Sequence, residues 1–178
     1  MEIAVRPTEP GDLEAIFQIF THPSVRPNQY PHVWLNSVER WQAALFGGLK
    51  FANGAFSSST ILNDALVVGH IMRMQRKGPE GDWCHCGWNL DPRYWGMGIM
   101  PIALSMEFEN LFGTLKVNHI ISDCFRDNHR CIRVLEKLNY EPVAIKFSDR
   151  LTTIIQTKCI RWILRYRLTQ AKLKALAQ

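Results

Sequence analysis

The apolar residues of this chain recur at helical spacing in some segments and follow strand-like runs in others. Leu13, Ile16 and Phe20 would share one face of a helix, whereas residues 56–62 and 66–74 are typical of strands. The whole pattern predicts, in chain order, a strand (3–6), two helices (ending near 20 and beginning near 36), three strands (56–62, 66–74 and 83–90), a helix (ending at 113), a strand (117–123), a helix (128–138) and two strands (140–147 and 152–164).

This order of elements indicates an α+β fold with a mixed central sheet of about seven strands flanked by helices. The sequences Asn63-Asp64 and Gly78-Pro79-Glu80-Gly81 are typical of turns between the predicted strands. We find no internal repeat and no shift in composition that would mark a second domain. We therefore expect one domain over residues 1–178, with a core from about 3 to 165 and a basic C-terminal tail over 166–178.

Composition narrows the class of protein. An apolar content of 47% in 178 residues is enough for one core. The chain has five cysteines, which do not follow the spacing of a small disulfide-bonded secreted protein, and its N-terminus lacks a signal-peptide pattern. Both features predict a reduced, cytoplasmic protein. No apolar run reaches the length of a membrane span, so we expect no membrane association.

The net charge of +5 is concentrated near the C-terminus, since residues 150–178 contain seven Lys or Arg and no acidic residue. The simpler interpretation is solvated surface. The alternative is a weak contact with nucleic acid or a ribosomal surface.

Residues 87–101 (GWNLDPRYWGMGIMP) combine a strand, a turn and a helix start. Gly96 and Gly98 have no side chain that would keep a phosphate from the backbone. The helix that follows presents unpaired N–H groups and the positive end of its dipole, and Pro101 is tolerated in its first turn. The segment therefore predicts an anion site.

Two common phosphate-binding loops do not match this segment. A Walker loop ends in Gly-Lys-Ser/Thr, which is missing here. A dinucleotide fingerprint needs a third glycine where this chain has Pro101.

Two motifs together resemble the GNAT N-acetyltransferase family. Arg93-x-x-Gly96-x-Gly98 after a strand is similar to the signature with which these enzymes hold the pyrophosphate of acetyl-CoA. Residues 128–140 (NHRCIRVLEKLNY) resemble a stretch of the ribosomal-protein-alanine (RimJ/RimL-like) acetyltransferase branch. The resemblance covers about residues 3–165.

The resemblance implies the GNAT fold, acetyl-CoA as co-substrate and no metal. In this family the strand before the loop separates from its parallel neighbour, and the pantetheine arm fills the gap between them. The strands over 83–90 and 117–123 would be that pair. The residues implied to bind acetyl-CoA are Leu90, Arg93, Tyr94, Trp95, Gly96, Met97, Gly98, Ile99, Met100 and Asn128. Leu90 would do so through its backbone, and the Asn128 side chain would either cap the helix that follows or meet the pantetheine arm.

Two residues are candidates for the proton transfers. His85 stands where the related branch commonly has Glu, and histidine is a competent base near neutral pH. Cys131 replaces the serine of the second motif and could donate weakly to the leaving sulfur, while Leu135 replaces the tyrosine that other branches use as general acid. Weaker candidates for the base are His70, Asp91, His119 and Asp123.

Other features have simpler explanations. Strand alternation would place Cys84 and Cys86 on one face and His85 on the other, so the three are not expected to form a metal site. The aromatic residues Tyr30, Trp34, Trp41, Trp83 and Trp88 could line an acceptor cleft or pack in the core.

We therefore expect an acetyl-CoA-dependent N-acetyltransferase that acts on a primary amine by direct attack. A peptide N-terminus is the leading acceptor and a small amine the other, and self-association is compatible with the sequence. The alternative is a noncatalytic acyl-CoA-binding or RNA-associated module of the same fold.

Overall fold

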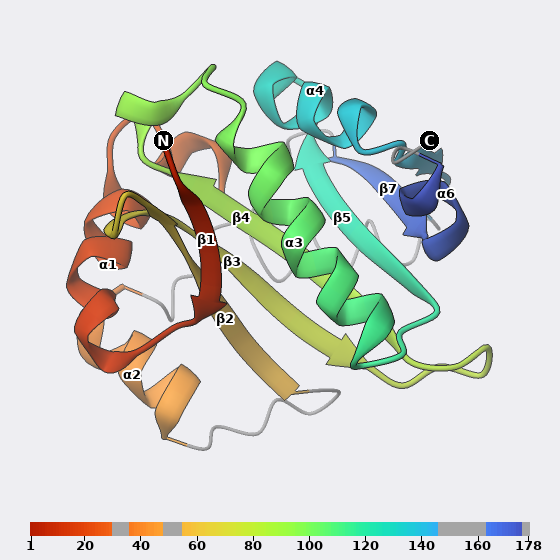
Figure 1. Ribbon diagram of the computed structural model, residues 1–178, viewed down its shortest axis with the longest axis horizontal. Coiled ribbons are helices and arrows are strands. Elements are labelled where there is room, and N and C mark those ends of the chain that lie inside the picture. Colours follow the sequence, from red (N-terminus) through yellow and green to blue (C-terminus); the bar gives the residue numbers. More distant parts are fainter. Residues whose placement is uncertain (30–35, 48–54, 146–162, 176–178) are drawn as a thin grey trace.

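The computed structural model of the protein describes residues 1–29, 36–47, 55–145 and 163–175. Its elements follow the predicted order (Figure 1). The strands are β1 (Ile3–Pro7), β2 (Ala55–Asn63), β3 (Leu66–Arg76), β4 (Trp83–Leu90), β5 (His119–Phe125), β6 (Glu141–Val143) and β7 (Ile163–Thr169). The helices are α1 (Leu13–Thr21), α2 (Val38–Phe46), α3 (Ile99–Gly113), α4 (His129–Lys137) and α6 (Gln170–Lys174), with short 3₁₀ turns η1 (Pro10–Asp12), η2 (Arg26–Asn28) and η3 (Pro92–Tyr94).

The strands form one mixed sheet in the order β1-β2-β3-β4-β5-β7-β6. Neighbouring strands are antiparallel except β4 and β5, which are parallel. A parallel pair needs a crossover, and α3 provides it. The predicted α+β fold with a seven-stranded mixed sheet is confirmed.

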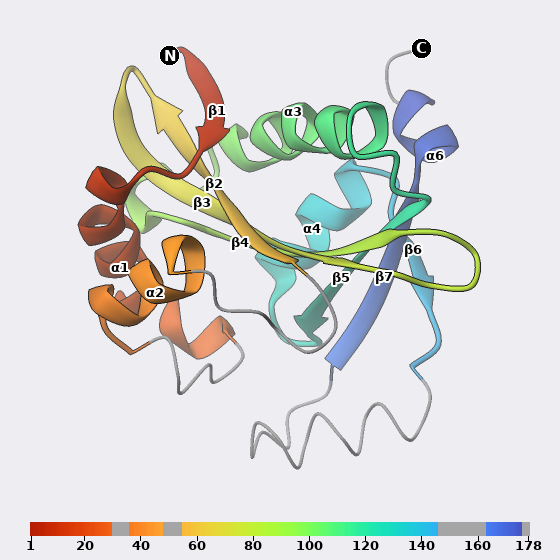
Figure 2. The same cartoon turned by 90° about the horizontal axis from the view of Figure 1, so that it is seen from below.

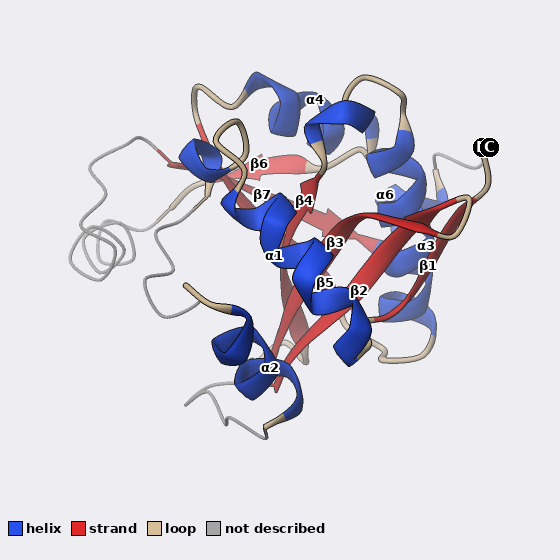
Figure 3. Cartoon of the chain, turned by 90° about the vertical axis from the view of Figure 1, so that its left-hand side faces the viewer, coloured by secondary structure: helices blue, strands red, loops and turns tan. Residues whose placement is uncertain are grey.

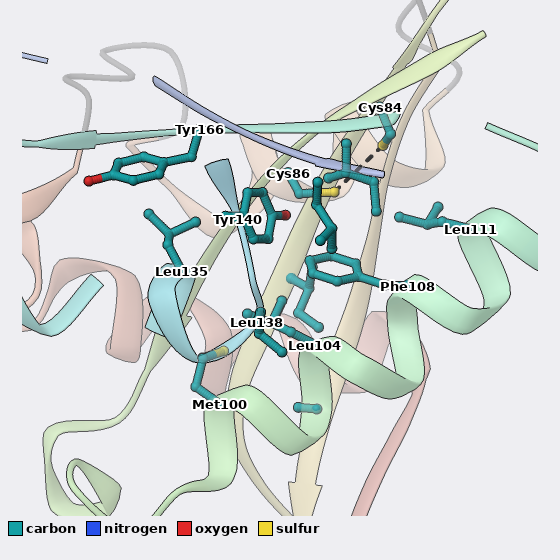
Figure 4. Close-up of a cluster of buried hydrophobic side chains, with 14 of the residues drawn as sticks. Cys84, Cys86, Met100, Leu104, Phe108, Leu111, Leu135, Leu138, Tyr140 and Tyr166 are labelled. Atoms are coloured by element: carbon teal, nitrogen blue, oxygen red, sulfur yellow. Dashed lines mark hydrogen bonds between the residues drawn. The ribbon is translucent and has the colours of Figure 1, made fainter. Parts of the chain in front are cut away.

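Helices cover both faces of the sheet (Figures 2 and 3). α3 and α4 pack on one face over a core that includes Ile71, Phe108 and Leu135, each fully buried (Figure 4). α1 and α2 pack on the opposite face, where Ile16 and Trp41 are fully buried. The residues of β4 and β5 therefore alternate between two different environments.

Local sequence explains where several helices begin and end. The Ser37 side chain accepts a hydrogen bond from the Arg40 amide at the start of α2. Asn139, just after α4, has a φ of 56°, the left-handed conformation that asparagine tolerates at the C-terminal end of a helix.

The C-terminal boundary differs from the expectation. β7 continues to Thr169, and Tyr166 and Leu168 within it are buried. Residues 166–169 therefore belong to the sheet, and the expected basic tail is reduced to α6 and the residues after it. Most of the strand expected over 152–164 lies outside the described residues.

Within the described ranges, no helix combines the length and the apolar character needed to cross a membrane.

Candidate active site

The loop after β4 is held in shape by Asp91. Its carboxylate accepts hydrogen bonds from the Arg93 amide at 2.9 Å and from the Arg93 guanidinium at 2.6 to 3.1 Å. The hydrogen bonds from Arg93 lower the pKa of Asp91. The amides of Tyr94 and Trp95 donate to the carbonyls of Asp91 and Pro92. These three amides are already bonded within the loop, so they are not open to a ligand.

The backbone amides of the next five residues, 96–100, are not bonded within the loop in this way. In the part of the chain that the structure describes, no backbone carbonyl accepts from the amides of residues 96–100. Gly96 and Gly98 have φ values of 82° and 77°, and a Cβ at either position would meet no atom within 4 Å. The space beside the loop is therefore open, and the N-terminus of α3 adds its positive dipole end there. Within residues 93–100, the amides open to an anion are therefore those of residues 96–100.

β4 and β5 separate next to this loop. They pair from Trp83 with His119 to His85 with Ile121, although β4 continues to Leu90. Beyond His85 the two strands diverge, and a gap opens that leads toward the loop (Figure 1). The separation expected for residues 83–90 and their parallel neighbour is present.

Trp95 connects the loop to both β4 and α4. Its indole Nε1 donates to the carbonyl of Leu90 at 2.8 Å, and the Arg130 guanidinium of α4 lies over its ring at 4.5 Å from the centroid. The Asn128 side chain accepts from the Cys131 amide at 3.2 Å, which confirms Asn128 as the N-cap of α4. The carbonyl of Leu90, expected to face the ligand, is thus already engaged by Trp95.

His85 lies on the sheet face opposite to its two cysteine neighbours. Cys84 and Cys86 are buried in the core with their Sγ atoms 3.6 Å apart, as strand alternation predicts. His85 Nε2 lies 3.4 Å from Oδ2 of Asp123. Arg165 Nε and NH2 donate to the two oxygens of the same carboxylate at 2.8 and 3.0 Å. Burial by itself would raise the pKa of Asp123, but the hydrogen bonds of His85 and Arg165 outweigh it and hold that pKa below its ordinary value.

Cys131 lies in the first turn of α4, at the end of β5. Its contact with the Cys124 thiol, together with burial, raises the pKa of Cys131 well above its ordinary value. A thiol of such high pKa can donate a hydrogen bond to a thiolate but is a weak acid for complete transfer. Leu135 is fully buried, and the nearby Tyr140 hydroxyl is buried against Ser122 at 3.2 Å. Neither side chain can therefore take the place of the tyrosine that other branches of the family use as general acid.

A buried chain of polar groups beside the site was not predicted. The Gln29 amide donates to the Phe20 carbonyl at 2.9 Å and to Asn89 Oδ1 at 3.0 Å, and Asn89 Nδ2 lies 3.3 Å from His70 Nε2. Gln29 is 60 residues from Asn89 in the chain, so no local pattern could have revealed the contact. Burial lowers the pKa of His70 to about 3, and this fully buried histidine is not placed to meet an acceptor.

The other candidates have structural partners. Asp91 holds the loop, and His119 stacks on Trp83 with ring centroids 5.9 Å apart. Trp41 is a core residue, and Trp88 packs against the other core. Tyr30 and Trp34, the remaining aromatic residues of the expected cleft, lie outside the described residues.

A loop of open amides and a separation between two parallel strands agree with the acyl-CoA-dependent N-acyltransferase fold that the resemblance implies. Residues 2–141 match the family model described as acetyltransferase (GNAT) domain. The chain belongs to this family and is an N-acetyltransferase.

Known relatives differ in the acceptors that their names give. The chain is 30% identical over 148 residues to the L-amino acid N-acetyltransferase AaaT of Escherichia coli strain K12, which covers 79% of this chain and 83% of that protein. Its fold is similar to Mycobacterium smegmatis RimJ in complex with CoA-disulfide (TM-score 0.75, 17% identity, 96% of this chain and 83% of that one). It is also similar to the spermidine N-acetyltransferase of Vibrio cholerae in complex with CoA and spermine (TM-score 0.76, 12% identity, 97% and 98%).

Acetyl-CoA is the acetyl donor of this family, and the described residues fit it. The open amides of residues 96–100 suit a pyrophosphate. β4 and β5 are no longer paired beyond His85, so the backbone groups of the two strands do not bond each other there.

Proposed function

We propose that this protein transfers the acetyl group of acetyl-CoA to a primary α-amine, either of a free amino acid or at the N-terminus of a peptide. The observation that supports this proposal is the position of His85. It is the last β4 residue paired with β5, so it lies where the gap begins, and its side chain faces the sheet side opposite to the α3 core. With 35% of its side chain exposed, His85 is accessible to a substrate.

The residues that would hold the donor are those with free polar groups beside the gap. Backbone amides of residues 96–100 would bind the pyrophosphate. Arg93 is turned toward Asp91, so its part is to hold the loop. Trp95 and Asn128 fix the loop and the start of α4 on the two sides of the gap.

The reaction needs two proton transfers. Bound acetyl-CoA supplies the acetyl group as a thioester. As the amine nitrogen forms its bond to the carbonyl carbon and the carbon–sulfur bond breaks, the acceptor ammonium loses two protons. His85 would take one of them and pass it to solvent, and the other ends on the leaving sulfur. Cys131 would offer a hydrogen bond to that sulfur from its protonated thiol.

Two observations favour an α-amine over a polyamine. The relative with 30% identity is named as an L-amino acid N-acetyltransferase. In addition, Asp123, the carboxylate that contacts His85, is already neutralised by Arg165, so it is not an open anionic site for a second ammonium group of a polyamine.

The donor site is tested with two glycines at opposite ends of α3. Gly98 and Gly113 are both exposed, and a Cβ at either meets no atom within 4 Å. Gly98→Val places a branched side chain beside the open amides and should weaken acetyl-CoA binding at least about tenfold, measured by calorimetry. Gly113→Val, at a residue without the positive φ of Gly98, controls for an added valine at the other end of α3 and should leave binding unchanged. Thermal unfolding of both variants reports any loss of fold. Equal affinity in a folded Gly98→Val protein would contradict the donor site.

The acceptor is tested by thiol release from acetyl-CoA with a panel of free L-amino acids, short peptides and spermidine. We expect turnover with the first two groups and little with spermidine. The reverse preference would contradict the α-amine proposal. Tight donor binding without thiol release for any amine would instead favour the noncatalytic alternative.

A further inference from the structure

His85, Asp123 and Arg165 form a connected group across three strands. His85 belongs to β4, Asp123 to β5 and Arg165 to β7. Asp123 lies two residues beyond Ile121, the last β5 residue paired with β4. The contact of His85 with Asp123 therefore bridges the two strands at the point where they separate.

The charge state of Asp123 determines which ring nitrogen of neutral His85 carries the proton. The Asp123 side chain is only 9% exposed and accepts two hydrogen bonds from Arg165, so it is held as a carboxylate. A carboxylate only accepts hydrogen bonds. For the 3.4 Å contact with Asp123 to be a hydrogen bond, Nε2 of His85 must carry the proton. In the neutral imidazole the lone pair is then on Nδ1.

Arg165 sets the role of Asp123 itself. Its two bonds to the carboxylate occupy both oxygens, and they make Asp123 a poor acceptor of a substrate proton. The carboxylate is thus suited to orient His85 and not to act as a base. The contact of 3.4 Å is long, as such contacts often are before substrate binds.

On this basis we propose that Asp123, held by Arg165, is a positioning residue that fixes His85 in the tautomer with the proton on Nε2, so that Nδ1 receives the proton of the acceptor amine. This inference rests on the proposed function for its catalytic half. The tautomer itself is a property of the free protein.

The charged groups around His85 bear on any test by pH. Arg76 of β3 lies over the Trp83 ring beside it. On β5, His119 and Asp123 share its sheet face, and on β7 Arg165 and Arg167 do so through their pairing with β5. The effect of changing one of these groups must therefore be measured both with His85 present and in a His85 variant.

The first test reads the tautomer in ¹⁵N-histidine-labelled protein by NMR, with His85→Gln used to assign the signal. We expect a proton on Nε2 of neutral His85, and mixed tautomers in Asp123→Asn, whose amide can donate as well as accept. A neutral His85 with its proton on Nδ1 in the unmodified protein would overturn the inference. This readout does not depend on turnover, so it separates the inference from the proposed function.

The second test is a double-mutant cycle for turnover. Asp123→Asn should lower kcat about tenfold to a hundredfold, with KM for acetyl-CoA unchanged. In a His85→Ala background the same substitution should have no further effect. An equal loss in both backgrounds would show a merely structural role and overturn the inference.

Removing one partner of a buried ion pair can destabilise the fold. Asp123→Asn combined with Arg165→Gln removes both charges together and should show the same dependence on His85. Unchanged turnover in His85→Ala alone would contradict the base of the proposed function and with it the catalytic half of this inference.

Discussion

The stability of the protein should fall steeply on mild acidification because of His70. This side chain is fully buried, and Asn89 Nδ2 points at its Nε2. Since Asn89 Oδ1 accepts from Gln29, the amide nitrogen of Asn89 faces the ring, so Nε2 of His70 is an acceptor and the proton is on Nδ1. Charging the ring would place a buried cation against an amide donor.

The magnitude follows from linkage. Burial lowers the pKa of His70 from 6.5 to about 3, so between these values the unfolded chain binds a proton that the folded chain does not. The free energy of unfolding is therefore complete above the unfolded pKa and decreases as pH falls below it. From about pH 8 to about pH 5, this one group should remove roughly 2 kcal/mol of stability.

Urea unfolding at the two pH values measures the effect. His70→Gln keeps a hydrogen-bond acceptor for Asn89 but cannot titrate, so its loss of stability on acidification should be smaller by about 2 kcal/mol. His129→Gln changes an exposed histidine and is the control. If His70→Gln loses as much stability as the unmodified protein, the buried neutral histidine is not the cause and the reasoning fails.

Two further predictions concern Cys131 and the basic C-terminal end. Because the pKa of Cys131 is raised, Cys131→Ala should lower kcat less than about tenfold, and Cys131→Ser should have nearly unmodified kcat; a loss of about a hundredfold in Cys131→Ala would show that the thiol is a true general acid. Lys172 is paired with Glu141 at 2.8 Å, so we expect no RNA binding at physiological salt. A salt-sensitive gel shift at micromolar protein that disappears when Lys172 and Lys174 are both changed to Gln would contradict this expectation.

The sequence by itself determined the order and the approximate bounds of most secondary-structure elements. Helical spacing and strand-like runs placed β4 at residues 83–90 and ended α3 at Gly113, both as the structure has them. These features are local, because capping, turn residues and apolar periodicity act within a few residues. The same holds for Gly96 and Gly98, whose left-handed backbone and place before a helix could be anticipated from their spacing.

The tertiary structure decided which residues meet. Only the placement of β7 between β5 and β6 brings Arg165 to Asp123, 42 residues away in the chain. Only the pairing of β4 with β5 places His85 beside Asp123, 38 residues away in the chain. Partners of this kind are selected by strand pairing and burial across the whole chain, and a local pattern contains no information about them.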